Sequence, residues 1–439
     1  MNKRILIIGA GPTGLGAAWR LNELGHNNWQ IYEQNSYVGG LSASFRDEKG
    51  FTWDIGGHVL FSHYEYFDRL FEKLLKQDYL ELKRRAYIWA CGRLVPYPFQ
   101  NNIRYLPGKK MQECLFGLLG ARLQKTGAAA NFKEWILANF GKGIAKYFML
   151  PHNSKVWAHP LEEMSYAWVG DRVSVVDLKR IIGNIVFSRE DASWGPNSRF
   201  KFPLYGGTGG LFEKFVPYIK QNLALNKKVK RIESKYKKII FDDNSEDNFD
   251  FLINTMPLDQ FICRSDLKEL QPAAGELKHN GVLVVGIGIK KKSPSGKCWV
   301  YFPENNAPFY RLTYFSNYSF NNVPSGDYYS LMCESSYSQH RVLDRETIIE
   351  NTIQGLINTK ILSVEDREDI VSTYVIDAEY AYPIPTLSRE ELLKNIHPYL
   401  EEKDIYSRGR FGAWKYEIGN MDHCVMQGAG TVNKILERC

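Results

Sequence analysis

A glycine-rich loop near the N-terminus joins an apolar strand to a helix. Residues 5–8 (ILII) run into Gly9, Gly11 and Gly14, and apolar residues then recur at helical spacing over residues 15–24. In this pattern the first glycine makes the turn, the second lets a pyrophosphate approach the backbone, and the third seats the helix on the strand. Because the free N–H groups of the helix N-terminus favour an anion, the loop predicts a dinucleotide-binding α/β unit.

An acidic residue and a second glycine pair extend the pattern. Glu33 follows the last loop glycine by 33 − 14 = 19 residues, close to the spacing of about 20 at which an acid meets a ribose hydroxyl. Gly39 and Gly40 then provide a second tight segment that would cover the same pyrophosphate, as in flavoproteins. We therefore predict FAD rather than NAD. The predicted cofactor-binding residues here are Gly9, Gly11, Pro12, Thr13, Gly14, Glu33, Gly39, Gly40, Leu41 and Ser42.

The composition is that of a globular protein. The chain has 439 residues, of which 44% are hydrophobic and 24% charged, enough for two or three domains. The net charge of +7 is spread along the chain without a long basic tract, which argues against nucleic-acid binding. The cysteines show no metal-ligand spacing and no apolar run can span a bilayer, so we expect a metal-free cytoplasmic protein with reduced thiols and no membrane insertion.

The periodicity of apolar residues changes along the chain. Residues 67–75 predict a helix, and 106–198 contain helical segments that we interpret as an insertion. Residues 227–257 alternate like strands, which we interpret as the return of the chain to the nucleotide-binding sheet. Residues 281–380 predict a mainly antiparallel sheet, and 404–434 end in a glycine turn and a helix that rejoin the first domain.

The predicted fold class is α/β: a dinucleotide-binding (Rossmann-like) FAD domain with a helical insertion and an antiparallel β-sheet substrate domain. The predicted boundaries are 1–82, 199–265 and 396–439 for the FAD domain, 83–105 and 266–395 for the β-sheet substrate domain, and 106–198 for the helical domain.

Eight longer motifs occur in the order typical of one enzyme family. They are WDIGGHVLFSHYEYFD (53–68), PYPFQNN (96–102), FMLPHNSKVWA (148–158), WVGDRV (168–173), WGPN (194–197), FPLYGGTGG (202–210), CWVYFPENNAPFYR (298–311) and SRGRFGAWKYEIGNMDH (407–423). Together they resemble the eukaryotic-type UDP-galactopyranose mutases, and the resemblance covers almost the whole chain. The glycine fingerprint alone would leave amine oxidases and protoporphyrinogen oxidase open.

The resemblance implies a reaction without net redox change. Members of this family interconvert UDP-galactopyranose and UDP-galactofuranose, and N5 of reduced FAD attacks the anomeric carbon and displaces the nucleoside diphosphate. The resemblance therefore implies an isomerase with a UDP-sugar substrate, NADPH or NADH as a possible reductant, and a role in cell-surface glycan biosynthesis.

The departing diphosphate carries nearly two negative charges, which guanidinium groups stabilise well because they offer planar, bidentate donors. By resemblance Arg172 and Arg311 take this role, and His58 lies beside the flavin and tunes it. The other catalytic residues implied are Asn197, Tyr301, Tyr382 and Tyr416.

The resemblance also places residues at the two ends of the substrate. Aromatic stacking and amide hydrogen bonds would bind the uridine. The implied substrate-binding residues are Tyr97, Gln100, Phe148, Asn153, Trp157 and Asn420. Further implied cofactor contacts are Gly57, His58, Val229, Arg410, Gly419, Asn420 and Met421, with the backbone of Gly207 and Gly209.

One departure from the family pattern leaves the substrate open. Met421 stands where the family usually has Gln, so a nucleotide-bound 6-deoxyhexose or pentose remains an alternative. An amine oxidase or protoporphyrinogen-oxidase-like enzyme is the alternative among flavoenzymes, and a non-catalytic nucleotide-sugar sensor is the alternative from another class. The chain ends soon after its last predicted helix, without the tail that builds tetramers in some relatives, so a monomer is favoured and an oligomer stays open.

Overall fold

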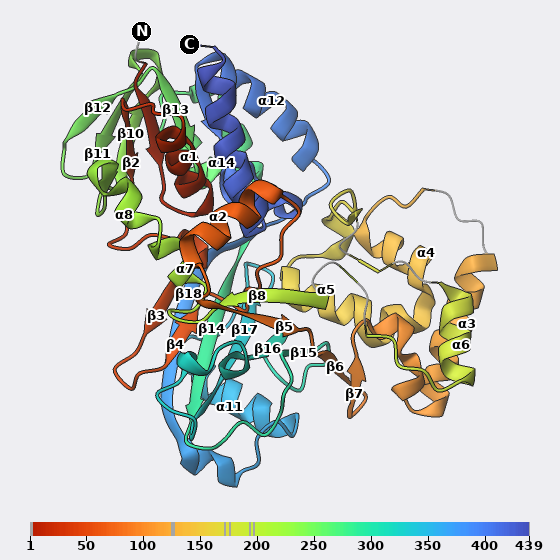
Figure 1. The fold of residues 1–439 in the computed structure, drawn as a ribbon. Helices are drawn as coiled ribbons and strands as arrows, with labels where there is room; N and C mark the ends of the chain where they lie inside the picture. The colour runs from red at the N-terminus through yellow and green to blue at the C-terminus, as the bar shows by residue number, and fades with distance from the viewer. Residues whose placement is uncertain are drawn as a thin grey trace.

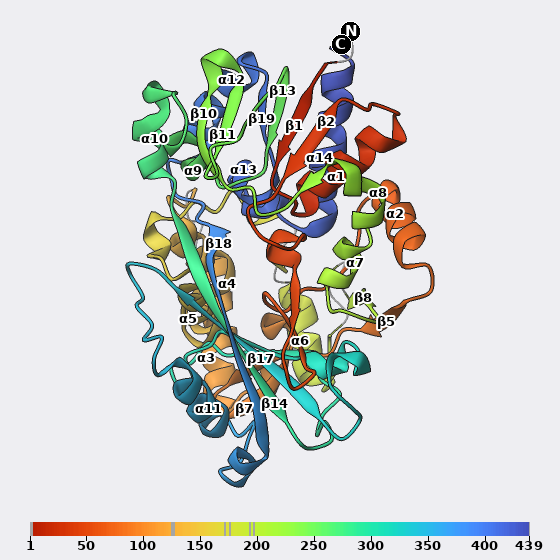
Figure 2. The same ribbon diagram turned by 90° about the vertical axis from the view of Figure 1, so that its left-hand side faces the viewer.

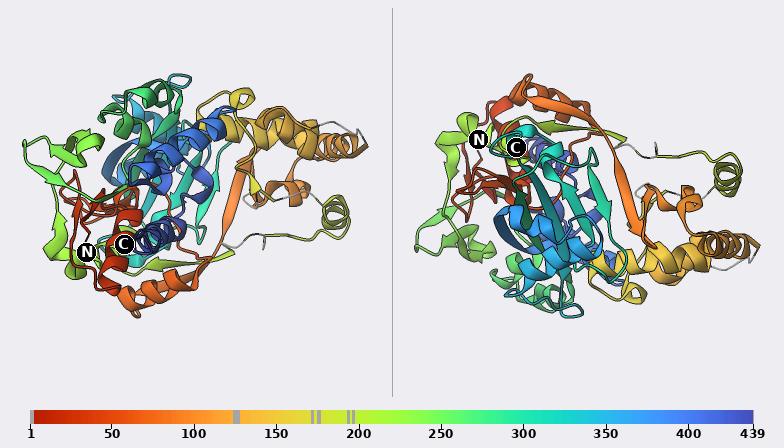
Figure 3. Two further views of the ribbon diagram at one scale, coloured as in Figure 1. Left: turned by 90° about the horizontal axis from the view of Figure 1, so that it is seen from above. Right: turned by 90° about the horizontal axis from the view of Figure 1, so that it is seen from below.

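Three regions make up the fold. The computed structural model describes residues 3–123, 128–170, 173–174, 177–192, 195 and 198–438. Figure 1 shows an α/β region at the top that holds both chain ends, a second sheet below it, and a helical region to the right. The helical region projects away from the other two in both views of Figure 3. This arrangement confirms the predicted fold class.

The N-terminal strand β1 (Ile5–Ile8) lies at the centre of a parallel sheet. The strand order is β19-β13-β1-β2-β9, and every neighbouring pair is parallel. Every residue of β1 and β13 is buried, as expected for central parallel strands covered on both faces. The remaining bounds are β2 (Trp29–Tyr32), β9 (Leu223–Ala224), β13 (Phe251–Asn254) and β19 (Ile405–Ser407).

The last helix of the chain packs on the first. α1 (Pro12–Glu23) and α14 (Met421–Leu436) share a core that includes Leu21 and Val425. Because β19 pairs with β13 and α14 packs against α1, the end of the chain rejoins the sheet that its start builds. The prediction for residues 404–434 is confirmed.

The prediction for residues 227–257 is only partly correct. β13 joins the parallel sheet, but β10 (Val229–Glu233), β11 (Lys238–Phe241) and β12 (Glu246–Asn248) form a separate antiparallel sheet. The physical reason is visible in their burial. Every second residue of β11 is buried, which suits a sheet with one face in water, whereas β13 is buried throughout.

A larger sheet lies below the α/β region in Figure 1. Its order is β18-β14-β17-β16-β15-β6-β7, and the β15·β6 pair is parallel while the others are antiparallel. The long strands β14 and β18 reach up from this sheet toward the α/β region, as Figure 2 shows. The bounds are β6 (Ala86–Ala90), β7 (Arg93–Pro96), β14 (His279–Ile289), β15 (Trp299–Tyr301), β16 (Arg311–Tyr314), β17 (Tyr329–Tyr337) and β18 (Ile370–Pro383). The mainly antiparallel prediction is confirmed.

The helical region is built from segments that the sequence predicted as helices. Asn131 caps α4 by accepting from the Glu134 N–H at 3.0 Å, and Asp177 caps α6. A π-helical turn at Ala145–Met149 connects α4 directly to α5. The bounds are α3 (Gly108–Leu123), α4 (Phe132–Ile144), α5 (Leu150–Trp157) and α6 (Leu178–Val186).

Shorter elements connect the three regions. α2 (Glu65–Leu75) buries Phe67, Leu70, Phe71, Leu74 and Leu75, which confirms the predicted helical stripe. No helix within the described ranges combines the length and apolarity needed to cross a membrane. The other bounds are β3 (Ser44–Arg46), β4 (Thr52–Asp54), β5 (Tyr79–Lys83), β8 (Arg199–Pro203), α7 (Gly209–Glu213), α8 (Val216–Ile219), α9 (Leu258–Cys263), α10 (Gln271–Glu276), α11 (Ile348–Asn358), α12 (Arg389–Glu402) and α13 (Gly409–Gly412).

Candidate functional site

The glycine loop makes a turn that side chains would block. Gly9 has φ +94°, and a Cβ there would clash with Thr255 Oγ1. A Cβ at Gly14 would clash with the carbonyl oxygen of Gly9, so only glycine lets α1 approach β1 this closely. α1 has neither an acidic residue in its first turn nor a side-chain cap at Gly11. Its first N–H groups therefore favour a bound anion.

The second glycine pair packs directly on this loop. The Gly39 N–H donates to the Ala10 carbonyl at 2.8 Å, and Gly40 (φ +51°) lies so close that a Cβ would be 3.2 Å from Gly11 Cα. Glu33, at the end of β2, is 4% exposed and accepts hydrogen bonds from Ala10 N (2.8 Å) and from Asn35. Burial raises the pKa of Glu33 despite these bonds.

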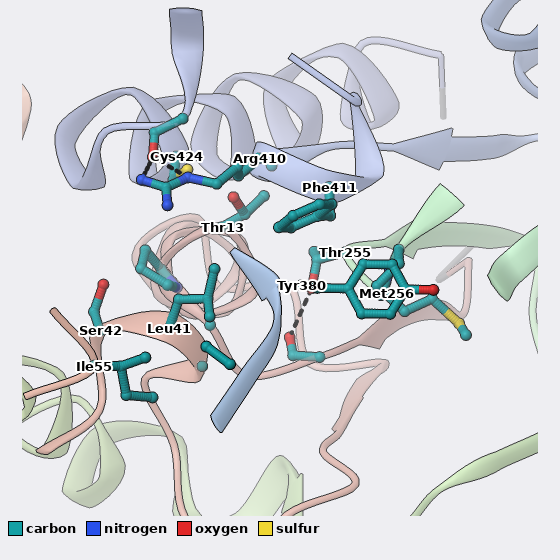
Figure 4. A pocket seen from close by; sticks show the side chains of 18 of the residues that line it. Thr13, Leu41, Ser42, Ile55, Thr255, Met256, Tyr380, Arg410, Phe411 and Cys424 are labelled. Carbon is teal, nitrogen blue, oxygen red and sulfur yellow. Dashed lines mark hydrogen bonds between the residues drawn. The ribbon is translucent and has the colours of Figure 1, made fainter. Parts of the chain in front are cut away.

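One elongated cavity of about 730 Å³ starts at this loop. Figure 4 shows Thr13 of α1 facing it, with Leu41 and Ser42 on one side and Tyr380 and Met256 on another. Its wall contains most of the predicted cofactor residues and four of the predicted catalytic ones. The predicted residues on its wall are Gly9, Gly11, Pro12, Thr13, Glu33, Gly40, Leu41, Ser42, Gly57, His58, Val229, Arg311, Tyr382, Arg410, Tyr416, Gly419, Asn420 and Met421.

Two predicted catalytic residues, Arg172 and Asn197, lie outside the described residues. Gly14 and Gly39 pack behind the cavity wall. Gly207 and Gly209, also expected at the cofactor, are not on the wall: Gly209 N–H donates to Ser44 Oγ at 2.7 Å, and a Cβ at Gly207 would clash with Asp54. This glycine turn packs against the β3–β4 hairpin, and its contact with the cofactor stays a prediction.

A buried ion pair carries Arg311, another residue of the cavity wall. Arg311 on β16 faces Glu334 on β17, with Nε···Oε1 at 2.6 Å and Nη2···Oε2 at 2.7 Å. Glu334 is 2% exposed and also accepts from Gly57 N (3.0 Å) and Tyr310 Oη (2.8 Å). Although burial opposes the charged form, the Arg311 charge holds the pKa of Glu334 below its usual range.

His58 lies on the cavity wall between two guanidinium groups. Burial, followed by the charges of Arg410 and Arg311, lowers the pKa of His58 to about 3. Its Nδ1 is buried and has no hydrogen-bond partner in the described part of the chain. The imidazole is therefore neutral at physiological pH and can offer hydrogen bonds but no positive charge.

Arg410 is a second guanidinium on the cavity wall. Its Nε and Nη2 donate to the Gly419 carbonyl at 3.2 and 3.0 Å, drawn as dashed lines in Figure 4, and Nη1 donates to the Ala381 carbonyl at 3.3 Å. Within the described ranges it forms no ion pair. Its charge therefore faces the cavity without a carboxylate partner, which favours an anionic ligand.

Aromatic side chains continue from the cavity toward the helical region. Tyr382 and Tyr416 have ring centroids 5.5 Å apart, and Trp157 lies 5.0 Å from Tyr416. Tyr301 packs 5.8 Å from Tyr97. Phe148 stacks on His152, whose ring lies 5.0 Å from Tyr301. The structure thus packs residues predicted for both ends of the substrate into one aromatic cluster, which reaches the cavity at Tyr382 and Tyr416.

Two predicted amide contacts are already used within the protein. Gln100 Nε2 donates to the Ser174 carbonyl at 2.9 Å, and Asn153 Nδ2 donates to the Met149 carbonyl at 2.7 Å. Both side chains are buried. Each amide nitrogen has a second N–H, so one N–H and the carbonyl oxygen of each side chain are left for a ligand.

Sequence reasoning missed Glu334 and the contribution of β18. Glu334 is the single carboxylate in the buried strand YSLMCESSY, and this isolated charge was the available signal. Residues 376–380 of β18 line the cavity, but their alternating pattern is that of an ordinary strand.

A family model and a known protein each match part of this sequence. Residues 7–74 match the model of the NAD(P)-binding Rossmann-like domain. Over 91 residues the chain is 37% identical to 4,4'-diaponeurosporene oxygenase from Staphylococcus aureus (strain USA300), which is 20% of this chain and 18% of the length of that relative. This match spans only a small part of either protein.

Solved structures match over the full length. A crystal structure of reduced UDP-galactopyranose mutase is 43% identical with a TM-score of 0.97, covering 100% of this chain and 95% of that one. A putative protoporphyrinogen oxidase from Exiguobacterium sp. 255-15 covers 100% of both chains at 16% identity and a TM-score of 0.76. A structure of putrescine oxidase matches over 99% of both chains, at 15% identity and with a TM-score of 0.68. The last two likenesses show the fold alone.

Proposed function

This chain belongs to the UDP-galactopyranose mutase family, and we propose that it interconverts the pyranose and furanose forms of a nucleotide sugar, with UDP-galactopyranose and UDP-galactofuranose as the pair to test first. The observation that carries the proposal is that Arg311 and Arg410 line the same cavity as the glycine loop, together with Tyr382 and Tyr416, and that both guanidiniums act on His58. Two guanidiniums beside a dinucleotide site suit a substrate with its own diphosphate.

The residues on the cavity wall fit FAD. The paired glycine segments leave room for a pyrophosphate at the N-terminus of α1, and Glu33 stands at the end of β2 where a ribose hydroxyl would lie. The cavity extends beyond this point to His58 and Asn420, where the flavin ring would be held. When bound and reduced, the flavin supplies the nucleophile that takes the sugar from its nucleotide.

The chain itself supplies anion binding and orientation. Arg311 uses Nε and Nη2 for Glu334, and its Nη1 makes no hydrogen bond within the described residues, so Nη1 can donate to a diphosphate oxygen. Arg410 adds a second charge from the α13 side. We propose that both stabilise the diphosphate as it leaves, that Arg172 joins them, and that Asn197 belongs to a segment covering the nucleotide.

The aromatic cluster supports a uridine site. Tyr97, Phe148 and Trp157 offer ring faces near Tyr301, and Gln100 and Asn153 keep their carbonyl oxygens for donors. We propose that the base stacks here while Tyr301, Tyr382 and Tyr416 contact the diphosphate. Because burial raises the pKa of Tyr382 and of Tyr301, both phenols stay neutral and can donate hydrogen bonds.

The decisive experiment compares redox states. The purified flavoprotein is incubated with UDP-galactofuranose before and after dithionite reduction, and UDP-galactopyranose is separated by chromatography. We expect product from the reduced protein and none from the oxidised one. Oxygen consumption with an amine or a porphyrinogen would instead indicate an oxidase, and nucleotide binding without turnover would indicate a sensor.

A panel of nucleotide furanoses then tests the sugar. Met421, at the start of α14, lies on the cavity wall where family members usually have Gln, which favours including a 6-deoxyhexose and a pentose. Faster turnover of one of these than of UDP-galactofuranose would reassign the substrate and keep the reaction.

Three further proposals accompany the function. NADPH or NADH is the physiological reductant, to be tested by anaerobic bleaching of the flavin. A cytoplasmic location is supported by the free thiols of the six cysteines in the described residues. A monomer is the proposed assembly, to be checked by light scattering.

A further inference from the structure

A cluster of potential metal ligands lies away from the cavity, where α5 and β17 end. His159 follows Ala158, the C-cap of α5, and Glu163 closes the short 3-10 helix Leu161–Glu163. His340 belongs to the turn after β17. One ligand atom from each lies within 4.8 Å of the other two, and none of the three residues lines the cavity. The cluster is therefore separate from the site described above.

The His159 ring carries a nitrogen that lacks a normal partner. The side chain is 7% exposed, and its buried Nε2 has no hydrogen-bond partner in the described part of the chain. The nearest carboxylate oxygen, Glu163 Oε2, is 3.4 Å away, beyond the usual range of about 2.7–3.2 Å. The ring meets His340 edge-on with centroids 5.0 Å apart. A buried polar atom without a bond is costly, and this one faces a carboxylate and a second imidazole.

The backbone around the cluster is fixed without any ion. Ser338 Oγ donates to the Ala158 carbonyl and accepts from His340 N at 3.0 Å. Ser338 and Arg341 exchange backbone hydrogen bonds of 3.0 and 3.2 Å. The two segments that carry the histidines are thus held together, while the Glu163 side chain is 62% exposed and His340 is exposed. These two side chains can close on an ion while His159 stays in place.

Lys278 adds a positive charge near His159. This charge opposes a bound cation, so an affinity below that of a structural zinc site is expected.

A second cluster of the same residue types is satisfied without an ion. Asp422 is 1% exposed and its two oxygens accept from His63 Nδ1 (2.8 Å), His63 N (3.1 Å) and His423 Nδ1 (3.1 Å). Both oxygens of the Asp422 carboxylate are therefore hydrogen-bonded without a cation. This His63–Asp422–His423 cluster provides a matched control.

We propose that His159, Glu163 and His340 form a binding site for one divalent transition-metal ion of the Zn²⁺ class, with water completing the coordination. Two imidazoles and one carboxylate favour Zn²⁺, Co²⁺ or Ni²⁺ over Mg²⁺ and Ca²⁺, which prefer oxygen ligands. Tetrahedral ligands at about 2.1 Å from the ion lie roughly 3.4 Å apart, so the two exposed side chains need to move inward only slightly. The ion would join the end of α5, which carries Trp157, to β17, which carries Glu334.

The test uses the flavin-loaded full chain without an affinity tag, treated with a chelator and titrated with Co²⁺. We expect one Co²⁺ to bind per chain and to give a visible absorption band. Added Zn²⁺ should displace the Co²⁺ and abolish this band. His340→Ala and Glu163→Gln should each weaken binding by about tenfold or more, while His63→Ala should leave it unchanged. Zn²⁺ should also raise the melting temperature of the unmodified protein but not that of His340→Ala.

Several outcomes would overturn the site. The proposal fails if the unmodified protein and His340→Ala bind Co²⁺ with equal affinity. It also fails if only His63→Ala loses binding, or if no saturable binding is seen. Because His340 and Glu163 are exposed, both variants should fold, and unchanged flavin content with an unchanged circular dichroism spectrum checks this. Glu163→Gln keeps the size of the side chain and changes only its ligand character.

Discussion

Glu334 and Arg311 face each other across β17 and β16 and are joined by two hydrogen bonds of 2.6 and 2.7 Å in a nearly solvent-free setting. The same carboxylate accepts the Gly57 N–H of the loop that carries His58. One buried charge therefore holds both the Arg311 guanidinium, which we propose binds the diphosphate, and the His58 loop, which we propose lies beside the flavin. Movement of either partner is expected to disturb the other.

Glu334→Gln should reveal this coupling. Removing one charge of a buried pair costs about 3 kcal/mol or more in unfolding free energy, because Arg311 is left without a counter-ion. We expect a lower melting temperature that UDP restores more strongly than in the unmodified protein, since its diphosphate replaces the lost carboxylate. Thermal denaturation with and without UDP measures both effects. Glu346→Gln, at an exposed position, is the control; equal UDP shifts in Glu334→Gln and the unmodified protein would contradict the coupling.

Arg311→Ala should abolish turnover while the flavin stays bound. The variant loses a guanidinium at the proposed leaving group, so we expect a decrease of about a hundredfold or more in kcat. Product formation by the reduced enzyme and the flavin-to-protein ratio are measured together. Arg345→Ala removes an exposed arginine paired with Asp377 and should keep full activity. Retained turnover in Arg311→Ala would refute the assigned role.

Arg410→Ala should weaken nucleotide binding. A hydrogen bond to a charged group contributes about 1.5–3 kcal/mol, so UDP affinity should fall about tenfold to a hundredfold. Calorimetric titration of UDP into the reduced protein measures this. Arg408→Ala is the matched control, because Arg408 pairs with Glu401 and does not line the cavity. A similar loss in both variants would indicate a general effect of charge.

His58→Phe should change the pH dependence of stability. Folded His58 has a pKa near 3, whereas an unfolded histidine titrates near pH 6.5. Between these values the unfolded chain binds the extra proton, so this group makes stability rise with pH from about 3 to 6.5, by up to about 1.4 kcal/mol per pH unit. The variant should therefore lose less stability on acidification, measured by denaturant unfolding from pH 5 to 7. If stability changed with pH equally in the variant and the unmodified protein, the His58 ring would have to be exposed to water in the folded protein.

Gly14→Ala should prevent cofactor binding. Its Cβ would clash with the Gly9 carbonyl, so α1 must shift away from the pyrophosphate site. We expect protein with little bound flavin by absorbance. Gly120→Ala, in α3, has nothing within 4 Å of the added Cβ and should retain flavin and gain up to about 1 kcal/mol. Normal flavin content in Gly14→Ala would mean that the loop relaxes.

Much of the fold could be predicted from local patterns. The β1 strand, the α2 stripe and the return of residues 404–434 each rest on periodicity or glycine spacing, which are properties of adjacent residues. The separate sheet of β10–β12 was mispredicted because the alternation of β11 identifies a strand without naming its partner. The metal-ligand cluster likewise joins His159 to His340, which no spacing rule connects.

The sequence by itself determined the dinucleotide loop, the order of strands and helices, and the family motifs with their arginines and tyrosines, because each depends on residues that are neighbours in the chain. Only the tertiary structure decided that Glu334 holds Arg311 and Gly57 together, that His58 is neutral, and that Gln100 and Asn153 each donate one hydrogen bond to a carbonyl of the protein. The physical reason is that burial and long-range hydrogen bonds set charge state and orientation. Both arise only when segments far apart in the sequence pack against each other.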